Sequence, residues 1–131
     1  DIIATGANQN ENGIYWFKAP SDTKTGSWIK HTIVNAGSNN SMNSMDIADM
    51  DQDGDMDIVS GTHRGSLKIS IWENDGRGNF KEHIVCPGKE SHLGSRVSDI
   101  DGDGDMDIVS IGWDNYPYLH LWRNDAILWN Y

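Results

Sequence analysis

Two short acidic segments contain the residues of this chain whose types and spacing best suit chemistry. Both have the pattern Asp-x-Asp-x-Asp-Gly-x-x-Asp, at residues 49–57 and 99–107. Calcium is a hard cation that takes six to eight oxygen ligands in flexible geometry, and alternating carboxylates on a tight loop supply such ligands. Carboxylates crowded on one loop repel one another strongly unless a cation lies between them. The sequence therefore predicts two calcium ions, one in each loop.

Each position of these loops has its own expected role. Side chains at positions 1, 3 and 5 project toward the ion, glycine at position 6 permits a sharp reversal, and position 7 offers its backbone carbonyl. Position 9 completes the site as the following strand begins. The expected metal ligands are Asp49, Asp51, Asp53, Asp55 and Asp57 in the first loop, and Asp99, Asp101, Asp103, Asp105 and Asp107 in the second. The side chains at position 7 are not expected to bind the ion.

An EF-hand is the main alternative form of an acidic calcium loop. It places a bidentate glutamate at position 12 and a helix on each side, whereas Ser60 and Ser110 stand at position 12 here and the flanking residues are strand-like. Mg²⁺ fits less well, because it resists dehydration and prefers near-octahedral ligands. The loops lack the bidentate glutamate of high-affinity sensors. We therefore expect permanently filled structural sites in a secreted or cell-surface setting, where free calcium is abundant.

The two loops belong to an internal repeat that extends over the chain. Residues 46–61 align with residues 96–111 at an offset of 50, and the match continues from 70–75 to 120–125. Residues 1–4 resemble residues 57–60, so Asp1 matches position 9 of a third loop. A repeat of this length is typical of propellers and other repeat architectures.

The repeat also aligns tryptophans and histidines. Trp16 is expected at the strand position of Trp72 and Trp122, in the core between repeats. His31 and His83 also recur in register, and we interpret both as structural residues rather than ligands.

Each repeat is expected to hold four short strands, which in the middle unit lie at 43–49, 57–62, 67–73 and 79–85. Four antiparallel strands in a repeat of ~40–50 residues are typical of a β-propeller blade. The predicted fold class is therefore all-β, a partial β-propeller of about three four-stranded antiparallel blades. The chain is treated as a single segment, 1–131, with blade pieces at approximately 1–35, 43–86 and 94–131. A closed ring needs at least about four blades, so we expect further blades or self-association to complete it.

Composition and charge narrow the possible partners. The formal net charge of −10 argues against nucleic acid and anionic membrane surfaces. No apolar run approaches the ~20 residues that a membrane-spanning helix needs. Cys86 is the single cysteine, so an internal disulfide is impossible. Neither a nucleophile elbow nor a phosphate-binding glycine loop is present, and we expect no catalytic residues and no cofactor other than Ca²⁺.

Three features of the chain resemble FG-GAP/VCBS-type repeats. They are the two loops, the Ile-Val-Ser sequence directly after each loop, and the Trp-x-Asn-Asp hairpins at 72–75 and 122–125. Such repeats occur in integrin α-chain propellers, propeller lectins and modules of secreted polysaccharide-active enzymes. The resemblance implies Ca²⁺ in the loops that join the first and second strands of a blade. The Phe-Gly/Gly-Ala-Pro element that names the family is not evident, which favours the bacterial, VCBS-like branch.

A surface for a ligand is expected at the end of the blades opposite the calcium loops. Aromatic planes beside polar and charged groups suit sugars, which stack their apolar faces and hydrogen-bond through their hydroxyls. The alternative is that these are ordinary polar propeller loops and that Trp113 packs between blades. The candidate residues are His63, Arg64, Glu90, His92, Arg96, Trp113, Asp114 and Tyr116.

Three functions remain open at this point. The first is a calcium-stabilised binding module for a glycan or a cell-surface protein. The second is a piece of a polysaccharide-active lyase or dehydratase, and the third is an architectural scaffold in a secreted protein. The sequence leaves enzyme activity uncertain and favours the non-enzymatic interpretations, because calcium ligation occupies the clustered carboxylates.

Overall fold

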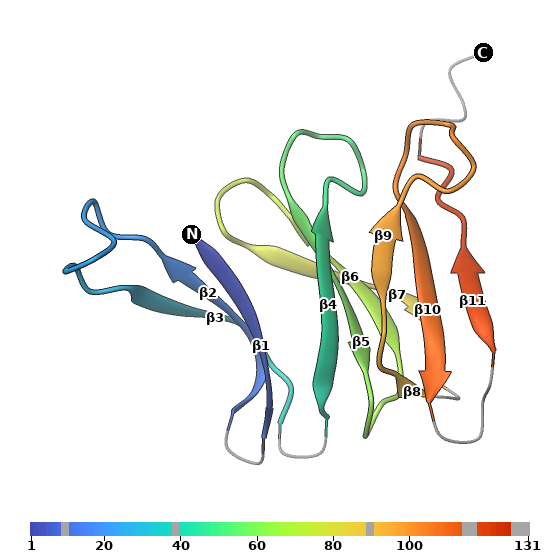
Figure 1. Cartoon of the computed structure of the whole chain (residues 1–131), viewed down its shortest axis with the longest axis horizontal. Helices are drawn as coiled ribbons and strands as arrows, with labels where there is room; N and C mark the ends of the chain where they lie inside the picture. The colour runs from blue at the N-terminus through green and yellow to red at the C-terminus, as the bar shows by residue number, and fades with distance from the viewer. Residues whose placement is uncertain (9–10, 38–39, 89–90, 114–117, 127–131) are drawn as a thin grey trace.

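The computed structural model describes residues 1–8, 11–37, 40–88, 91–113 and 118–126. Within these ranges the chain forms strands and turns, and the strands make three antiparallel sheets that stand side by side (Figure 1). This arrangement confirms the predicted all-β fold class, with blade-like sheets of three or four strands. The described part of the chain holds no helix with the length and apolar character that crossing a membrane requires.

The first sheet contains three strands, β1 (Ile2–Asn8), β2 (Glu11–Lys18) and β3 (Ile29–Asn35), in that order. Each strand pairs with the next strand along the chain, so chain order and spatial order coincide. β1 pairs with β2 along its whole length, from Ile2 opposite Phe17 to Asn8 opposite Glu11.

The second sheet is a complete four-stranded unit. Its strands are β4 (Met42–Ala48), β5 (Asp57–Thr62), β6 (Ile69–Asn74) and β7 (Phe80–Cys86), again in chain order. Each lies within two residues of a predicted strand. The β6–β7 turn contains Gly76 and Gly78 at φ 70° and 86°, a backbone conformation that glycine adopts without steric cost.

The third sheet differs at its first strand. β8 (Ser91–His92) and β9 (Arg96–Ser98) both pair with β10 (Asp107–Trp113), and β11 (Leu119–Trp122) pairs with β10 as well. Two short strands therefore take the place that the continuous β4 takes in the second sheet.

Alternate residues of β5 face the two neighbouring sheets, because successive side chains of a strand point to opposite faces. Ile58 is fully buried in a core with Ile14 and Met42, between the first and second sheets. Val59 is fully buried in a second core with Met50 and Ile108, between the second and third sheets. Each core thus joins one repeat to the next.

The tryptophan alignment is correct for two residues and wrong for the third. Trp72 pairs with Ile58 and Trp122 with Ile108, at equivalent places in β6 and β11. Trp16 instead pairs with Ile3, one residue away from that position, which Phe17 occupies opposite Ile2. A shift of one residue turns a side chain to the other face of the sheet.

The histidine alignment is confirmed. His31 pairs with Trp16, and His83 pairs with Ile71, at equivalent places of the first and second sheets. The ring of His31 also stacks on that of Trp16, with centroids 4.6 Å apart.

The first strands of the second and third sheets are linked directly. Ser44 on β4 donates a hydrogen bond from its hydroxyl to that of the buried Ser95 at 3.2 Å. The carboxylate of Asp46 accepts a hydrogen bond from the backbone N–H of Val97 at 3.0 Å. These contacts fix the relative height of the two sheets, and therefore of the loops that follow β4 and β9.

Candidate metal centre

The two acidic loops lie at the same end of the sheets, between β4 and β5 and between β9 and β10 (Figure 1). The glycines at position 6, Gly54 and Gly104, have φ of 97° and 99°, which explains why glycine stands there. Position 4 is also left-handed, at φ 63° for Gln52 and 80° for Gly102. Sequence reasoning missed this second reversal, which Gln52 makes without being glycine.

The carboxylates at positions 1, 3 and 9 of each loop converge. In each loop they offer one oxygen apiece, and these three oxygens lie within 4.8 Å of one another. The converging residues are Asp49, Asp51 and Asp57 in the first loop, and Asp99, Asp101 and Asp107 in the second. Six of the ten predicted ligands are therefore brought together, in two equivalent groups of three.

The aspartate at position 9 anchors each loop to its sheet. Asp57 is 1% exposed, and its two carboxylate oxygens accept hydrogen bonds from the backbone N–H groups of Met50 and Asn74, both at 2.8 Å. Asp107 repeats the arrangement with Ile100 at 2.9 Å and Asn124 at 2.8 Å.

Burial raises the pKa of Asp57, and the charges of Asp51 and Asp53 act in the same direction, against the lowering effect of its two N–H donors. A cation beside this buried carboxylate would favour its ionised form.

The aspartate at position 1 organises the backbone of its loop. The carboxylate of Asp49 accepts hydrogen bonds from the N–H groups of Asp53 at 3.1 Å and Gly54 at 3.0 Å. In the second loop, Asp99 accepts from Gly102 at 2.7 Å and Gly104 at 3.1 Å. The chain is therefore wrapped around the position-1 carboxylate in both loops.

The side chains at position 5 form hydrogen bonds within their own loops. Asp53 and Asp103 are not among the converging oxygens described above; each accepts a hydrogen bond from the N–H at position 7, at 2.9 Å and 3.2 Å. That N–H donor comes first among the groups that hold the pKa of Asp103 below its ordinary value.

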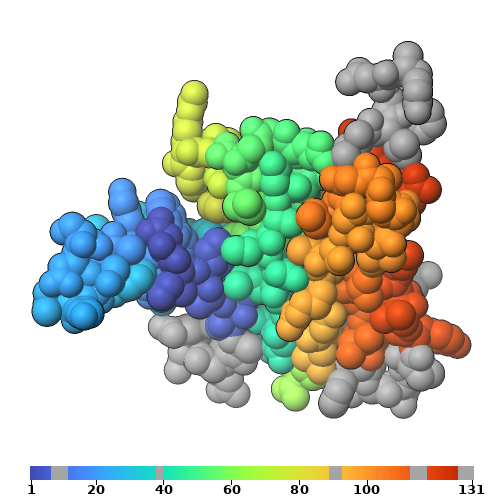
Figure 2. All heavy atoms as spheres, turned by 45° about the horizontal axis from the view of Figure 1, so that its top comes forward, coloured from blue at the N-terminus to red at the C-terminus, as the bar shows by residue number. Residues whose placement is uncertain are grey.

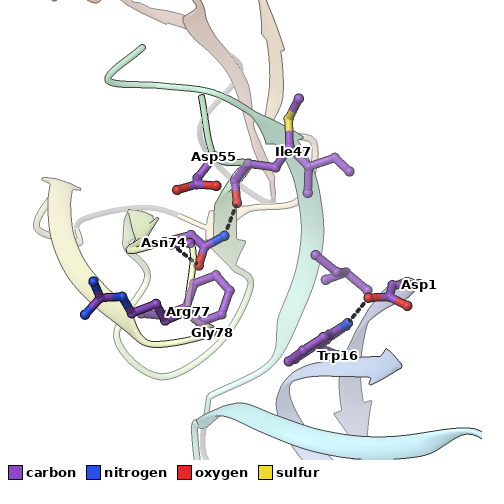
Figure 3. A pocket seen from close by; sticks show the side chains of 11 residues that line it. Asp1, Trp16, Ile47, Asp55, Asn74, Arg77 and Gly78 are labelled. Atoms are coloured by element: carbon purple, nitrogen blue, oxygen red, sulfur yellow. Dashed lines mark hydrogen bonds between the residues drawn. The ribbon is translucent and has the colours of Figure 1, made fainter. Parts of the chain in front are cut away.

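The two position-7 residues do not behave alike. Asp55 borders a hollow between the first and second sheets, together with Asn74 and Arg77 (Figure 3), and its carboxylate lies against Gly76. Asp105 is 1% exposed and hydrogen-bonds with Asp103. The second loop therefore buries its position-7 side chain, whereas that of the first loop borders a hollow.

Asp1 has a bonding pattern close to that of position 9. Its carboxylate accepts hydrogen bonds from the backbone N–H of Ala19 at 2.8 Å and from the indole N–H of Trp16 at 3.0 Å. The first of these donors matches Asn74 at the first loop, at the end of the corresponding strand. The match of Asp1 to position 9 thus extends from sequence to hydrogen bonding.

One hydrogen bond connects the two loops directly, and a second connects the first loop to the chain just after β11. The side-chain amide of Gln52 donates to the carbonyl of Gly104 at 3.1 Å, and that of Asn124 donates to the carbonyl of Met50 at 2.7 Å. Figure 2 shows the loops, in green and orange, in contact at this end of the molecule. The candidate sites are therefore neighbours within one surface.

The donor chemistry fits calcium. The converging atoms are carboxylate oxygens, which are ligands that Ca²⁺ prefers. Zinc and copper sites are built mainly from thiolate and imidazole groups instead. The residues at positions 1, 3 and 9 would hold the ion, with oxygens from positions 5 and 7 available to complete its shell.

Two of the residues predicted to form a ligand surface lie at the end opposite the acidic loops. His63 and Arg64 lie in the β5–β6 connection, at the end of the sheets away from the acidic loops (Figure 1). Arg96 begins β9, where its guanidinium donates to the carbonyls of Ser95 at 2.6 Å and Met45 at 3.5 Å.

The remaining five residues of this predicted surface are described in part or not at all. His92 pairs with Gly112 and Trp113 pairs with Ser91 through the backbone of β8 and β10, so His92 and Trp113 are close to one another along that edge. Their side chains lie outside the described atoms. Glu90, Asp114 and Tyr116 lie outside the described residues. The ligand surface therefore stays a prediction.

Repeated antiparallel sheets, two of which carry an acidic loop at the same end, define a class of all-β repeat protein. The sequence model of the FG-GAP-like repeat matches the chain twice, over residues 1–60 and 49–110. The chain therefore belongs to the FG-GAP-like repeat family. Comparisons with curated proteins and with solved structures gave no match.

Proposed function

We propose that this chain is a calcium-stabilised binding or scaffold module of a secreted or cell-surface protein. Its FG-GAP-like repeats indicate a β-propeller-type binding or scaffold module. The observation that supports calcium is the convergence of three carboxylate oxygens within 4.8 Å in each of two equivalent loops. Three aspartates converge in the same way in two successive repeats, and a divalent cation needs such a group of oxygen ligands.

Calcium would stabilise the module by neutralising charge at a buried position. Asp57 and Asp107 are each 1% exposed and tie their loops to the sheets through backbone N–H groups. An ion that binds only the folded form raises the free energy of unfolding. Its role is structural, because it fixes the connection between the first two strands of each blade-like sheet.

Thermal unfolding with matched cations tests this role. We expect the unfolding midpoint to rise in millimolar CaCl₂ and to return to its starting value with excess chelator, while equal MgCl₂ gives a much smaller rise. The double variant Asp49→Asn and Asp99→Asn removes one converging carboxylate from each loop and should abolish the difference between the two salts. An equal response of wild type and double variant to CaCl₂ would contradict a role for the loops.

The proposed binding surface is the end of the sheets opposite the acidic loops, and the proposed ligand is a glycan or a protein at the cell surface. In a chain with net charge −10, the exposed Arg64 supplies positive charge in the β5–β6 connection, away from the acidic loops (Figure 1). A glycan array with and without chelator tests this, with Arg64→Ala as the variant and Arg77→Ala, on the β6–β7 hairpin, as the control. Loss of binding in both variants, or no binding at all, would count against this surface.

A further blade-like sheet is the proposed neighbour of the third sheet. Leu119 and Leu121 on β11 are 70% and 55% exposed. Their counterparts in the second sheet, Ile69 and Ile71, pack in the core against the third sheet. Additional repeats or a second copy of the chain would cover this face, and the mass of the protein in solution distinguishes the two. If wild type and the double variant Leu119→Ser and Leu121→Ser both have the mass of a monomer in solution, a second copy of the chain does not cover this face.

A further inference from the structure

A guanidinium group lies against the second acidic loop. Nε of Arg123 is 3.0 Å from Oδ2 of Asp101, and an Nη atom is 3.7 Å from Oδ2 of Asp103. The same Nε also pairs with Asp125 at 2.7 Å. Two of the carboxylates expected to bind the metal are therefore already paired with a positive charge from the protein itself.

The first loop has the opposite charge at the equivalent place. Trp72 and Trp122 pair with Ile58 and Ile108, so the residues that follow them, Glu73 and Arg123, occupy matching positions. The next residue in each case donates its backbone N–H to the position-9 carboxylate at 2.8 Å. Residues 73 and 123 therefore each stand directly before the residue whose backbone N–H binds the position-9 carboxylate of its loop.

Glu73 does not supply a positive charge to the first loop. Its carboxylate pairs with His83 and with Lys81, at 3.6 Å for the latter, on its own sheet. The two loops share the same five aspartates but differ by two units of charge in the residue beside them.

This difference acts directly on the affinity for a divalent cation. A unit charge about 5 Å from Ca²⁺ in a water-like dielectric changes the binding constant by about tenfold at low salt. A positive charge lowers the affinity, and a negative charge raises it. In addition, Ca²⁺ must share the carboxylate of Asp101 with the guanidinium of Arg123.

We propose that the two loops bind calcium with unequal affinity, that the first loop fills first, and that Arg123 sets the difference by acting as the internal counter-ion of the second loop. This inference rests on the proposed calcium function. It also implies that the second loop depends less on calcium for its order, because Arg123 offsets part of the repulsion between its carboxylates. Among the described residues no cation pairs with an aspartate of the first loop, so this loop depends on calcium more.

Calcium titration by calorimetry tests the proposal when the sites are separated by mutation. Asp99→Asn leaves the first loop as the remaining site, and Asp49→Asn leaves the second. We expect the chain with Asp99→Asn to bind Ca²⁺ at least about tenfold more tightly at low salt than the chain with Asp49→Asn. The difference should shrink as NaCl is added, because salt screens the charge of an exposed guanidinium.

The charge at position 123 is then changed by itself. Arg123 is 51% exposed in its side chain, so Arg123→Gln should leave the fold intact, and circular dichroism checks this. In the chain with Asp49→Asn, Arg123→Gln should raise the calcium affinity by about tenfold. Arg64→Gln makes the same charge change at the opposite end and should have little effect. The reciprocal change, Glu73→Arg in the chain with Asp99→Asn, should lower affinity.

The outcomes separate the inference from the function on which it rests. Equal affinities of the two single-loop chains, or an effect of Arg123→Gln no larger than that of Arg64→Gln, would overturn the inference and leave calcium binding in place. Two-site titration of the otherwise unchanged chain with Arg123→Gln gives the same comparison if a single-loop chain does not fold. Absence of calcium binding in wild type would overturn both.

Discussion

The side-chain amide of Gln52 donates a hydrogen bond to the backbone carbonyl of Gly104, 52 residues further along the chain, and so joins the two acidic loops. Asn124 makes a second link in the other direction, from the third sheet to Met50 in the first loop. The loops therefore form part of the contact between sheets. Folding of one loop supports its neighbour, whether or not a metal is bound.

The Asn124 link predicts a measurable loss of stability. Asn124→Ala removes a part-buried hydrogen bond of 2.7 Å to Met50, and we expect the free energy of unfolding to fall by about 0.5–1.5 kcal/mol. Gln52→Ala removes a more exposed bond and should cost less. Urea denaturation in excess chelator measures both without a contribution from calcium. A larger loss for Gln52→Ala than for Asn124→Ala would contradict this ranking.

Asp57→Asn should destabilise the protein even without calcium. Both oxygens of this buried carboxylate accept backbone N–H groups, so an amide would turn an NH₂ group toward an N–H donor. We expect a loss of about 1–3 kcal/mol in chelator and loss of the calcium response of the first loop.

The matched control for this change is Asp55→Asn, whose side chain borders the hollow seen in Figure 3. We expect it to keep the calcium response of the first loop. If both variants lose that response to the same degree, the distinction between positions 7 and 9 is wrong.

The core between the first and second sheets predicts a large effect at one isoleucine and a small one at another. Ile14 is fully buried there, and Ile14→Ala should lower the free energy of unfolding by about 2–5 kcal/mol. Ile29 is 58% exposed at the start of β3, so Ile29→Ala should change it by no more than about 0.5 kcal/mol. Chemical denaturation of both variants checks the contrast, and similar losses would mean that the two sheets do not pack as described.

The Lys68–Glu82 pair predicts a pH dependence at the far edge of the second sheet. Burial acts to raise the pKa of Glu82, but hydrogen bonds from Lys68 and Ser70 outweigh it and hold the pKa below its ordinary value. A lowered pKa contributes stability above the pKa of the unfolded state, and this stability is lost as pH falls through the folded-state pKa.

The difference in stability between wild type and Glu82→Gln isolates this contribution from that of the acidic loops. We expect wild type to be more stable by about 1 kcal/mol at neutral pH and the gap to shrink below about pH 4. Urea denaturation of both proteins across this range measures it. A gap that stays constant as pH falls would show that ionised Glu82 is not its source.

Much of the fold can be predicted from the sequence because the repeat supplies independent copies of one pattern. The acidic loops set the register, and the alternation of Leu67, Ile69 and Ile71 predicts a strand within two residues of β6. The convergence of positions 1, 3 and 9 followed the spacing of the aspartates. These features depend on local chain geometry, which spacing encodes.

Other features depend on contacts that spacing does not encode. Trp16 was assigned to the wrong face because aromatic identity suggested an alignment that backbone pairing with Ile3 does not support. Arg123 was overlooked, although its place between Trp122 and Asn124, where the other repeat has Glu73, was a visible signal. The effect of Arg123 on the second loop depends on how closely the end of β11 approaches that loop, which spacing does not show.

The most direct test of the account is a calorimetric titration of the unmodified, metal-free chain with CaCl₂. We expect two calcium ions per chain, with dissociation constants near the 10⁻⁴–10⁻³ M of extracellular calcium modules. At a concentration ten to one hundred times the dissociation constant, each ion would add about 1.4–2.7 kcal/mol to the free energy of unfolding. No heat of binding, together with an unfolding midpoint that CaCl₂ and chelator leave unchanged, would contradict the central claim that these loops are calcium sites.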